Sequence, residues 1–246
     1  MESIIITSRN NEKIKSVRKL HQASARRETG LHFIEGNKLV LEAQANGAAL
    51  DTVFALEDAA QLIPDCTLVT LPVMEALCGV QSVQGLCATV KTPSTACPAQ
   101  YPEGFYVLLE QLQDPGNLGT ILRTADAMGA EGVLLSPDSA DPYSPKALRA
   151  AMGATYHLPV YVGDPETELP KLQAQGFSCI CGDLSGEETL PKRGANTVLV
   201  IGNEGHGISE TVAQLCYRYR MPMRGRAESL NAAIFAAIMM EKLINS

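Results

Sequence analysis

Short apolar runs and helically spaced apolar residues alternate along the N-terminal part of the chain. The runs are typical of strands, and the helical spacing is typical of amphipathic helices. The predicted strands cover residues 3–7, 31–36 and 50–56, and the predicted helices cover residues 10–24 and 37–47. The helix over 37–47 ends at Gly47, a residue type that favours the left-handed backbone found after many helices. This pattern predicts a small α/β domain over residues 1–92.

A proline-rich stretch, KTPSTACPAQYPEG at residues 91–104, interrupts the alternation. Prolines and small polar residues of this kind are typical of boundaries between domains. We therefore interpret residues 93–104 as a linker between a domain over 1–92 and a second domain over 105–246.

The second domain repeats the strand–helix pattern and again predicts an α/β fold. Its predicted strands cover residues 105–110, 132–136, 157–162, 177–181 and 197–202. Its predicted helices cover residues 117–130, 144–154, 169–176 and 229–245. Asn117 and Ser229 are of the residue types that cap helix N-termini, and Pro145 suits a first helical turn.

The predicted helix over 229–245 is apolar on nearly every face. Its large apolar residues are Ile234, Phe235, Ile238, Met239, Met240 and Leu243. A helix of this kind is buried on more than one side. Two explanations are equally open: a subunit interface, which predicts a homodimer through this helix, or a central position in the core.

Composition narrows the class of protein. The chain has 246 residues, of which 46% are hydrophobic and 19% charged, as in folded globular proteins. It shows no membrane-length apolar run and no signal peptide, so a cytoplasmic protein is expected. The odd number of cysteines, 7, and the 4 unclustered histidines predict reduced thiols and no metal site.

Charge is unevenly distributed. The whole chain has a net charge of −7, whereas residues 1–40 hold eight basic and four acidic side chains. This asymmetry is compatible with a polyanion-binding arm, but by itself it is better explained as a solvated helix face.

Three turns in the second domain carry polar residues and glycine, and each follows a run that predicts a strand. They cover residues 114–129, 201–209 and 219–233. Ligand sites in open α/β sheets lie beyond the carboxyl ends of strands, so the three turns are candidates for one site.

Each turn contains an unusual residue. Arg123 lies near the positive end of its predicted helix, which suggests an anionic partner such as a phosphate or Glu204, although taken by itself it is better explained as an exposed salt-bridging arginine. Glu204 lies in the middle of a glycine turn whose G-x-x-G-x-G order differs from that of dinucleotide-binding loops. Met221 and Met223 offer soft apolar contact to a flat ring. Asn231 is not a favoured residue inside a helix.

Together, the three turns resemble the three motifs of the SpoU/TrmH family of SPOUT RNA methyltransferases. The first motif is similar to Asn117-Leu118-Gly119 with Arg123, and the second to the GNEGHG at 202–207. The third is similar to MPMRG at 221–225 followed by Ser229-Leu230-Asn231. The N-terminal part more loosely resembles the family's small substrate-binding domain, which is akin to ribosomal protein L30e.

This resemblance implies a C-terminal knotted methyltransferase domain that binds S-adenosylmethionine and methylates a ribose 2′-hydroxyl in RNA. The residues it implies for cofactor binding are Ile201, Gly202, Gly205, Met221, Met223 and Leu230. Those it implies for catalysis are Arg123, Asn117, Glu204, Ser229 and Asn231. Because a guanidinium is always protonated, we expect Arg123 to clamp a phosphate and stabilise a forming alkoxide, and not to act as a base.

The expected RNA contacts are basic residues of the N-terminal arm and of the helix predicted over 144–154. They are Arg9, Lys13, Lys15, Arg18, Lys146 and Arg149. Ribosomal RNA is favoured as the substrate, with transfer RNA as the alternative. A non-catalytic RNA-binding assembly factor and a dinucleotide-dependent enzyme are further alternatives, opposed respectively by the intact motifs and by the glycine order.

Overall fold

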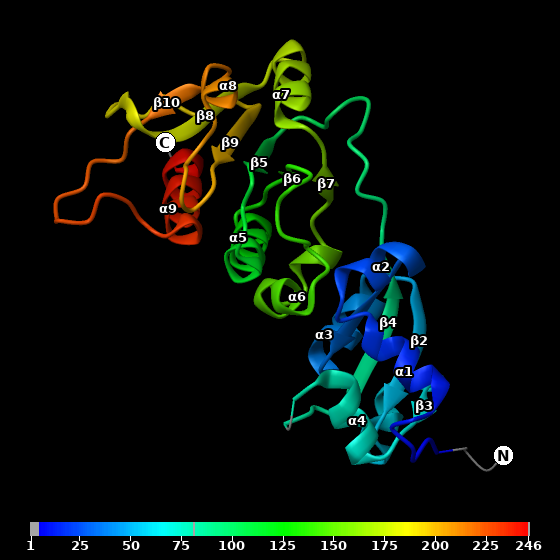
Figure 1. The fold of residues 1–246 in the computed structure, drawn as a ribbon. Coiled ribbons are helices and arrows are strands. Elements are labelled where there is room, and N and C mark those ends of the chain that lie inside the picture. The colour runs from blue at the N-terminus through cyan, green and yellow to red at the C-terminus, as the bar shows by residue number, and fades with distance from the viewer. Residues whose placement is uncertain (1–4, 81, 246) are drawn as a thin grey trace. The chain divides into compact units, whose positions relative to one another are not determined.

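The computed structural model describes residues 5–80 and 82–245, which form two compact units (Figure 1). The first unit contains the described residues up to Pro93 together with Tyr143–Tyr156. The second unit contains Ser94–Pro142 and the described residues from His157 onward. The segment Tyr143–Tyr156 therefore packs with the first unit, although the sequence boundaries place it in the second domain.

The first unit is built around a four-stranded sheet of order β1-β4-β2-β3. β1 pairs antiparallel with β4, β4 antiparallel with β2, and β2 parallel with β3. These strands cover Leu31–Glu35 (β1), Leu50–Ala55 (β2), Thr67–Leu68 (β3) and Leu86–Lys91 (β4).

Helices cover both faces of this sheet. One core contains apolar residues of α1 and α4, such as Ile14 and Leu77, packed on Phe33 of β1. The other contains Val40 of α3 and Leu148 of α6. The helices are α1 (Glu12–Lys19), α2 (Ala23–Thr29), α3 (Asn37–Ala45), α4 (Leu71–Cys78) and α6 (Pro145–Ala151), with 3-10 turns at Glu57–Leu62 (η1) and Ala154–Tyr156 (η2).

Three predictions for this unit can be compared directly. Gly47 follows α3 with a φ of 75°, which confirms its predicted role after the helix end. The single helix predicted over 10–24 is wrong, because the chain turns after Lys19 and begins α2 at Ala23. Of the strand predicted over 3–7, residues 3 and 4 lie outside the described residues, and Ile6 forms one bridge with Val69.

The second unit contains a six-stranded sheet of order β10-β8-β9-β5-β6-β7, in which all neighbouring strands are parallel. Every predicted strand of this domain has a counterpart, which confirms the α/β class. The strands cover Phe105–Leu109 (β5), Gly132–Leu135 (β6), Val160–Val162 (β7), Ser178–Glu187 (β8), Thr197–Ile201 (β9) and Tyr217–Tyr219 (β10).

The central strands β5 and β9 are buried along their whole length, because helices cover both sheet faces. One face packs against α7 (Pro165–Ala174) and α8 (Glu210–Ala213). On the other, α9 (Ala232–Ile244) lies beside α5 (Pro115–Ala127) and contacts β9 (Figure 1).

The helix predicted over 169–176 begins earlier than expected. Asp164 caps it by accepting a hydrogen bond from the backbone of Glu166, and Pro165 occupies its first position. Pro170 lies inside the helix, where proline is unfavourable, and this is why the sequence pattern placed the start too late.

Because the strands of the second unit are parallel, the turns after β5, β9 and β10 leave the sheet at the same edge. These are the three motif-bearing turns. Among the described residues, no helix is long and apolar enough to span a membrane. The same residues include no cluster of three or more His, Cys, Asp or Glu side chains suited to a metal ion.

Candidate active site

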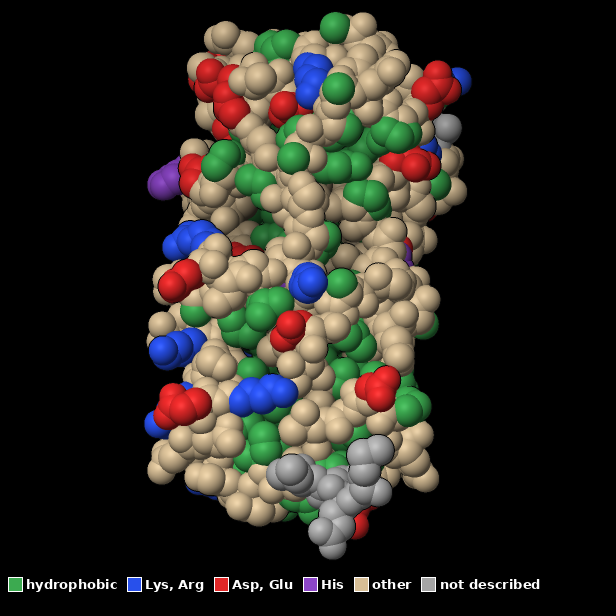
Figure 2. Space-filling view, turned by 90° about the vertical axis from the view of Figure 1, so that its right-hand side faces the viewer, with side chains coloured by type: hydrophobic (Ala, Val, Ile, Leu, Met, Phe, Trp, Pro, Cys, Tyr) green, Lys and Arg blue, Asp and Glu red, His purple; other side chains and the backbone are tan. Residues whose placement is uncertain are grey.

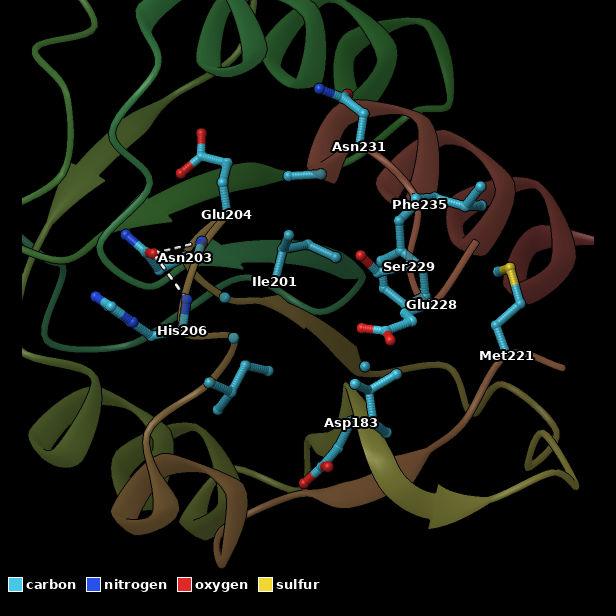
Figure 3. A pocket seen from close by; sticks show the side chains of 18 of the residues that line it. Asp183, Ile201, Asn203, Glu204, His206, Met221, Glu228, Ser229, Asn231 and Phe235 are labelled. Atoms are coloured by element: carbon cyan, nitrogen blue, oxygen red, sulfur yellow. Dashed lines mark hydrogen bonds between the residues drawn. The ribbon is translucent and has the colours of Figure 1, made fainter. Parts of the chain in front are cut away.

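A cavity of about 390 Å³ opens at this edge of the sheet (Figure 3). It is lined by the turn after β9, by the segment between β10 and α9, and by Gly182–Leu184 of β8. All six residues predicted to bind the cofactor line it: Ile201, Gly202, Gly205, Met221, Met223 and Leu230. Glu204, Ser229 and Asn231 line it as well, whereas Asn117 and Arg123 are not among its lining residues.

The turn after β9 is closed by its own backbone. Asn203 and Gly207 donate to each other's carbonyls at 2.9 and 3.0 Å. A Cβ added to Gly202 would lie 2.3 Å from the carbonyl carbon of Gly207, so only glycine fits at position 202. The Asn203 side chain accepts from the backbone of Gly205 and His206 and donates to the Gln111 carbonyl at 2.8 Å. The turn is therefore fixed in shape and attached to the segment after β5.

Glu204 points from this turn toward the start of α5. Its carboxylate accepts hydrogen bonds from the backbone of Gln113 and Asp114, each at 3.1 Å, and from Asn117 Nδ2 at 3.0 Å. Burial alone raises the pKa of Glu204, but the hydrogen bonds from Asn117 and the two backbone amides outweigh it. The pKa therefore lies below its usual value, and Glu204 is ionised at neutral pH.

Asn117 connects Glu204 to the third turn. While its Nδ2 donates to Glu204, its Oδ1 accepts from Asn231 Nδ2 at 3.0 Å. One residue from each motif thus enters a single hydrogen-bonded chain, Glu204–Asn117–Asn231. In Figure 3, Glu204 and Asn231 lie on one side of the cavity and Asp183 of β8 on the opposite side.

The two predicted N-terminal helix caps, Asn117 and Ser229, are both wrong. Asp114 caps α5 by accepting from the backbone of Gly116 and Asn117, because the helix begins at Pro115 and Asn117 already lies within it. Asn231 caps α9 by accepting from the backbone of Ala233 and Ile234, whereas Ser229 lies before the helix. Capping therefore accounts for Asn231, which the sequence pattern left unexplained.

Arg123 lies exposed on α5, beyond Asn117. Within the described part of the chain its side chain forms no hydrogen bond or ion pair, and so it does not form the ion pair with Glu204 that was considered from the sequence. Its guanidinium is consequently available to an anion from outside the chain.

Two residues that the sequence analysis missed close the far end of the second turn. Glu110, only 5% exposed, accepts from Ser209 Oγ at 2.6 Å and from Ser209 N at 3.0 Å. Ser209 in turn caps α8 by accepting from the backbone of Val212. The available signal was a carboxylate directly after the buried strand β5, because a buried charge requires partners.

The six predicted RNA contacts all belong to the first unit. Several already have partners: Arg9 pairs with Glu75 at 3.6 Å, Lys15 with Glu12 at 2.8 Å, and Arg149 with Glu35 at 2.7 Å. Lys13 Nζ lies 5.5 Å from the Phe54 ring centre, and Arg18 and Lys146 are exposed. On the face in Figure 2, Lys and Arg side chains stand between Asp and Glu side chains and do not form one continuous patch.

Comparison with known proteins agrees with this geometry. The SpoU rRNA Methylase family model matches residues 104–241, and the MRM3-like substrate binding domain model matches residues 11–88. The first match covers more than half of the chain, so this chain belongs to the SpoU rRNA methylase family.

Individual relatives extend the similarity to nearly the whole chain. The 23S rRNA (guanosine(2553)-2′-O)-methyltransferase RlmP of Bacillus subtilis is 30% identical over 248 residues, covering 97% of this chain and 98% of that protein. The crystal structure of an AdoMet-bound rRNA methyltransferase from Sinorhizobium meliloti superimposes with a TM-score of 0.90 at 31% identity, covering 98% and 97% of the two chains. A 23S rRNA (uridine(2479)-2′-O)-methyltransferase of Streptomyces viridochromogenes is 34% identical over 152 residues, which is 56% of this chain and 51% of that protein.

The cap assignment predicts a difference between two neighbouring substitutions. Asn231→Ala removes the acceptor for two backbone amides and is expected to lower the free energy of unfolding by about 1 kcal/mol. Ser229→Ala removes no cap and is expected to change it by less than about 0.5 kcal/mol. Urea unfolding followed by circular dichroism measures both. Asn231→Ser, which retains a capping oxygen, serves as the control, and equal losses for Asn231→Ala and Ser229→Ala would contradict the assignment.

Proposed function

We propose that this chain transfers the methyl group of S-adenosylmethionine to a ribose 2′-hydroxyl of ribosomal RNA. The observation that carries the proposal is the hydrogen-bonded chain Glu204–Asn117–Asn231, which unites the family's three motifs beside one cavity. The activity follows from family membership and from relatives that are named as rRNA 2′-O-methyltransferases. Ribosomal RNA is chosen over transfer RNA because the same relatives are named as rRNA methyltransferases.

The second unit is proposed to contain the family's trefoil knot, and the first to be an L30e-like domain. β10 is the outermost strand of the sheet. After it, the chain returns to the middle of the sheet and forms α9, which packs against α5 and β9. The segment between β10 and α9 and the turn after β9 line one cavity. A C-terminal segment threaded through an earlier loop accounts for both features. Knots are rare exceptions among folds.

The chemistry of the cavity fits S-adenosylmethionine. Met221, Met223, Leu230 and Ile201 provide apolar contact for an adenine ring, and the turn at Gly202 brings backbone groups close to a ligand. Asp183 and Glu228 also line the cavity, and their carboxylates complement a positively charged ligand. When bound, S-adenosylmethionine supplies a methyl group on a positively charged sulfur.

Around this group, the chain's own residues position the RNA. We assign Arg123 to a phosphate of the substrate, where it also stabilises negative charge that develops on the 2′-oxygen. Ionised Glu204 holds Asn117, and Asn117 and Asn231 orient the ribose. Ser229 lines the cavity beside them and helps to order the site. Because the transferred methyl is already activated, alignment of the hydroxyl supplies much of the rate.

We also propose that the enzyme is a homodimer that packs through α9. Ile234 is 52% exposed on this helix, and Phe235 and Ile238 beside it are only partly buried. The inner face, with Met239, Met240 and Leu243, is fully buried within the chain. An apolar outer face on an otherwise core-packed helix is typical of a subunit interface. The cytoplasmic location stays a prediction.

Arg123→Ala is predicted to lower turnover by about 10² to 10³-fold while cofactor affinity stays within about twofold, because Arg123 is assigned to RNA and not to the cavity. The purified variant is incubated with methyl-labelled S-adenosylmethionine and, separately, with large-subunit rRNA, small-subunit rRNA and transfer RNA. Calorimetry measures cofactor binding.

The control for this experiment is Lys192→Ala, an exposed cation of the same unit. The unmodified enzyme and this control are expected to label one of the two ribosomal RNA pools. In that RNA, the linkage next to the methylated ribose is expected to resist alkaline cleavage. Label in transfer RNA alone would contradict the substrate assignment. Cofactor binding without label in any pool would favour a non-catalytic RNA-binding factor.

Ile234→Glu is predicted to convert the dimer to a monomer, because it places a charge in an apolar interface. Sedimentation velocity measures the change. Leu62→Glu, which alters an exposed leucine of the first unit, is the control and is expected to leave the dimer intact. The same mass for Ile234→Glu and the unmodified protein would refute the interface on α9.

A further inference from the structure

A second cavity, of about 350 Å³, lies wholly within the first unit. It is bounded by the end of β1, the start of α3, the segment between α4 and β4, and α6. Residues that line it include Glu35, Lys38, Val80, Gln84, Arg149 and Met152. Its volume falls within the range of small-ligand pockets. None of the catalytic or cofactor-binding assignments above uses it.

One carboxylate oxygen beside this cavity lacks a hydrogen-bond partner among the described residues. Glu35 Oε1 accepts from Arg149 Nη1 at 2.7 Å, but Glu35 Oε2 is shielded from solvent and has no hydrogen-bond partner among the described residues. The exposed side chains of Lys38 and Gln84 also form no hydrogen bond or ion pair within the same residues. A shielded carboxylate oxygen without a donor is unusual in a folded protein and gains free energy when a ligand supplies one.

Apolar side chains complete the walls. Val80 is 38% exposed and Met152 is 49% exposed, which is high for large apolar residues. Leu39 and Leu148 also line the cavity. A flexible methionine beside aliphatic walls packs well against the face of a planar ring. The cavity therefore combines apolar walls with a carboxylate acceptor and two cationic donors.

Close contacts hold the backbone around the cavity. Gly36 has a φ of 99°, and a Cβ there would lie 2.9 Å from Gln84 Oε1, so the backbone and the Gln84 amide approach closely. Asn37 Oδ1 accepts from the backbone of Leu86 at 2.9 Å and attaches α3 to the start of β4. A Cβ on Gly153 would lie 3.0 Å from Glu42 Cγ, which shows how closely the end of the α6 segment packs on α3.

We propose that this cavity binds an unpaired guanine of the substrate RNA. Guanine presents N–H donors for a carboxylate on its Watson–Crick edge and the acceptors O6 and N7 for Lys or Arg on its major-groove edge, which matches Glu35 with Arg149 and Lys38. Sequence-specific RNA recognition uses splayed-out bases of this kind. The inference deepens the proposed function and rests on it, because it identifies how the first unit reads RNA.

The test uses the full chain and short fluorescent oligouridylates that carry one central guanosine, adenosine, cytidine or uridine. Fluorescence anisotropy is expected to show about tenfold tighter binding of the guanosine oligomer than of the all-uridine oligomer. Glu35→Gln, which places a donor beside the guanine N–H groups, abolishes that preference. Glu57→Gln, an exposed glutamate on η1 away from the cavity, retains it.

Equal binding of the four oligomers, or a preference that persists in Glu35→Gln, overturns the proposal. If Glu35→Gln fails to fold, Gln84→Leu, at an exposed position on the cavity wall, replaces it and is expected to weaken guanosine binding by about threefold or more. The same preparations are assayed for methyl transfer to ribosomal RNA. Methylation without guanine preference refutes the pocket alone, and guanine preference without methylation refutes the proposed function alone.

Discussion

The hydrogen-bonded chain Glu204–Asn117–Asn231 is the interaction on which the site depends. Glu204 and Asn117 are 87 positions apart in the sequence, and Asn117 and Asn231 are 114 apart, yet each pair lies within 3.0 Å. Parallel strands bring the three turns to one edge of the sheet, but only these side chains fix how the turns meet. The lowered pKa of Glu204 keeps its carboxylate an acceptor at neutral pH, so the chain of hydrogen bonds stays complete.

Several residues both stabilise the fold and shape the site. Asn231 caps α9 with its oxygen and uses its amide nitrogen to hold Asn117. Glu110 and Ser209 close one end of the second turn, and Asn203 closes the other against the segment after β5. These hydrogen bonds fix how the turns around the cavity meet, and a preformed site reduces the free-energy cost of ordering a ligand. Arg123 differs from these residues, because it is exposed on α5 and its side chain has no partner within the described part of the chain.

Much of this was predictable from the sequence. The buried strands β5, β6 and β9 are recognisable in the sequence as apolar runs, and each motif-bearing turn follows a predicted strand. The caps were not predictable, because Asp114, Asn117, Ser229 and Asn231 are all good capping residues and the exact helix start selects among them. The packing of Tyr143–Tyr156 with the first unit was not predictable either, because an apolar residue such as Leu148 would be buried against either unit. The Glu204–Asn117 contact depends on the angle between two turns, which no local pattern encodes.

The most direct test of this account is a double-mutant cycle on cofactor affinity, measured by calorimetry, with Asn117→Ala and Asn231→Ser. The serine retains the cap of α9 and removes only the donor to Asn117. If the hydrogen-bonded chain holds the cavity together, the double variant loses little more affinity than either single variant, with a coupling free energy of about 1 kcal/mol. Losses that add fully would mean that the three turns are held independently, and would contradict the central role of this chain of hydrogen bonds.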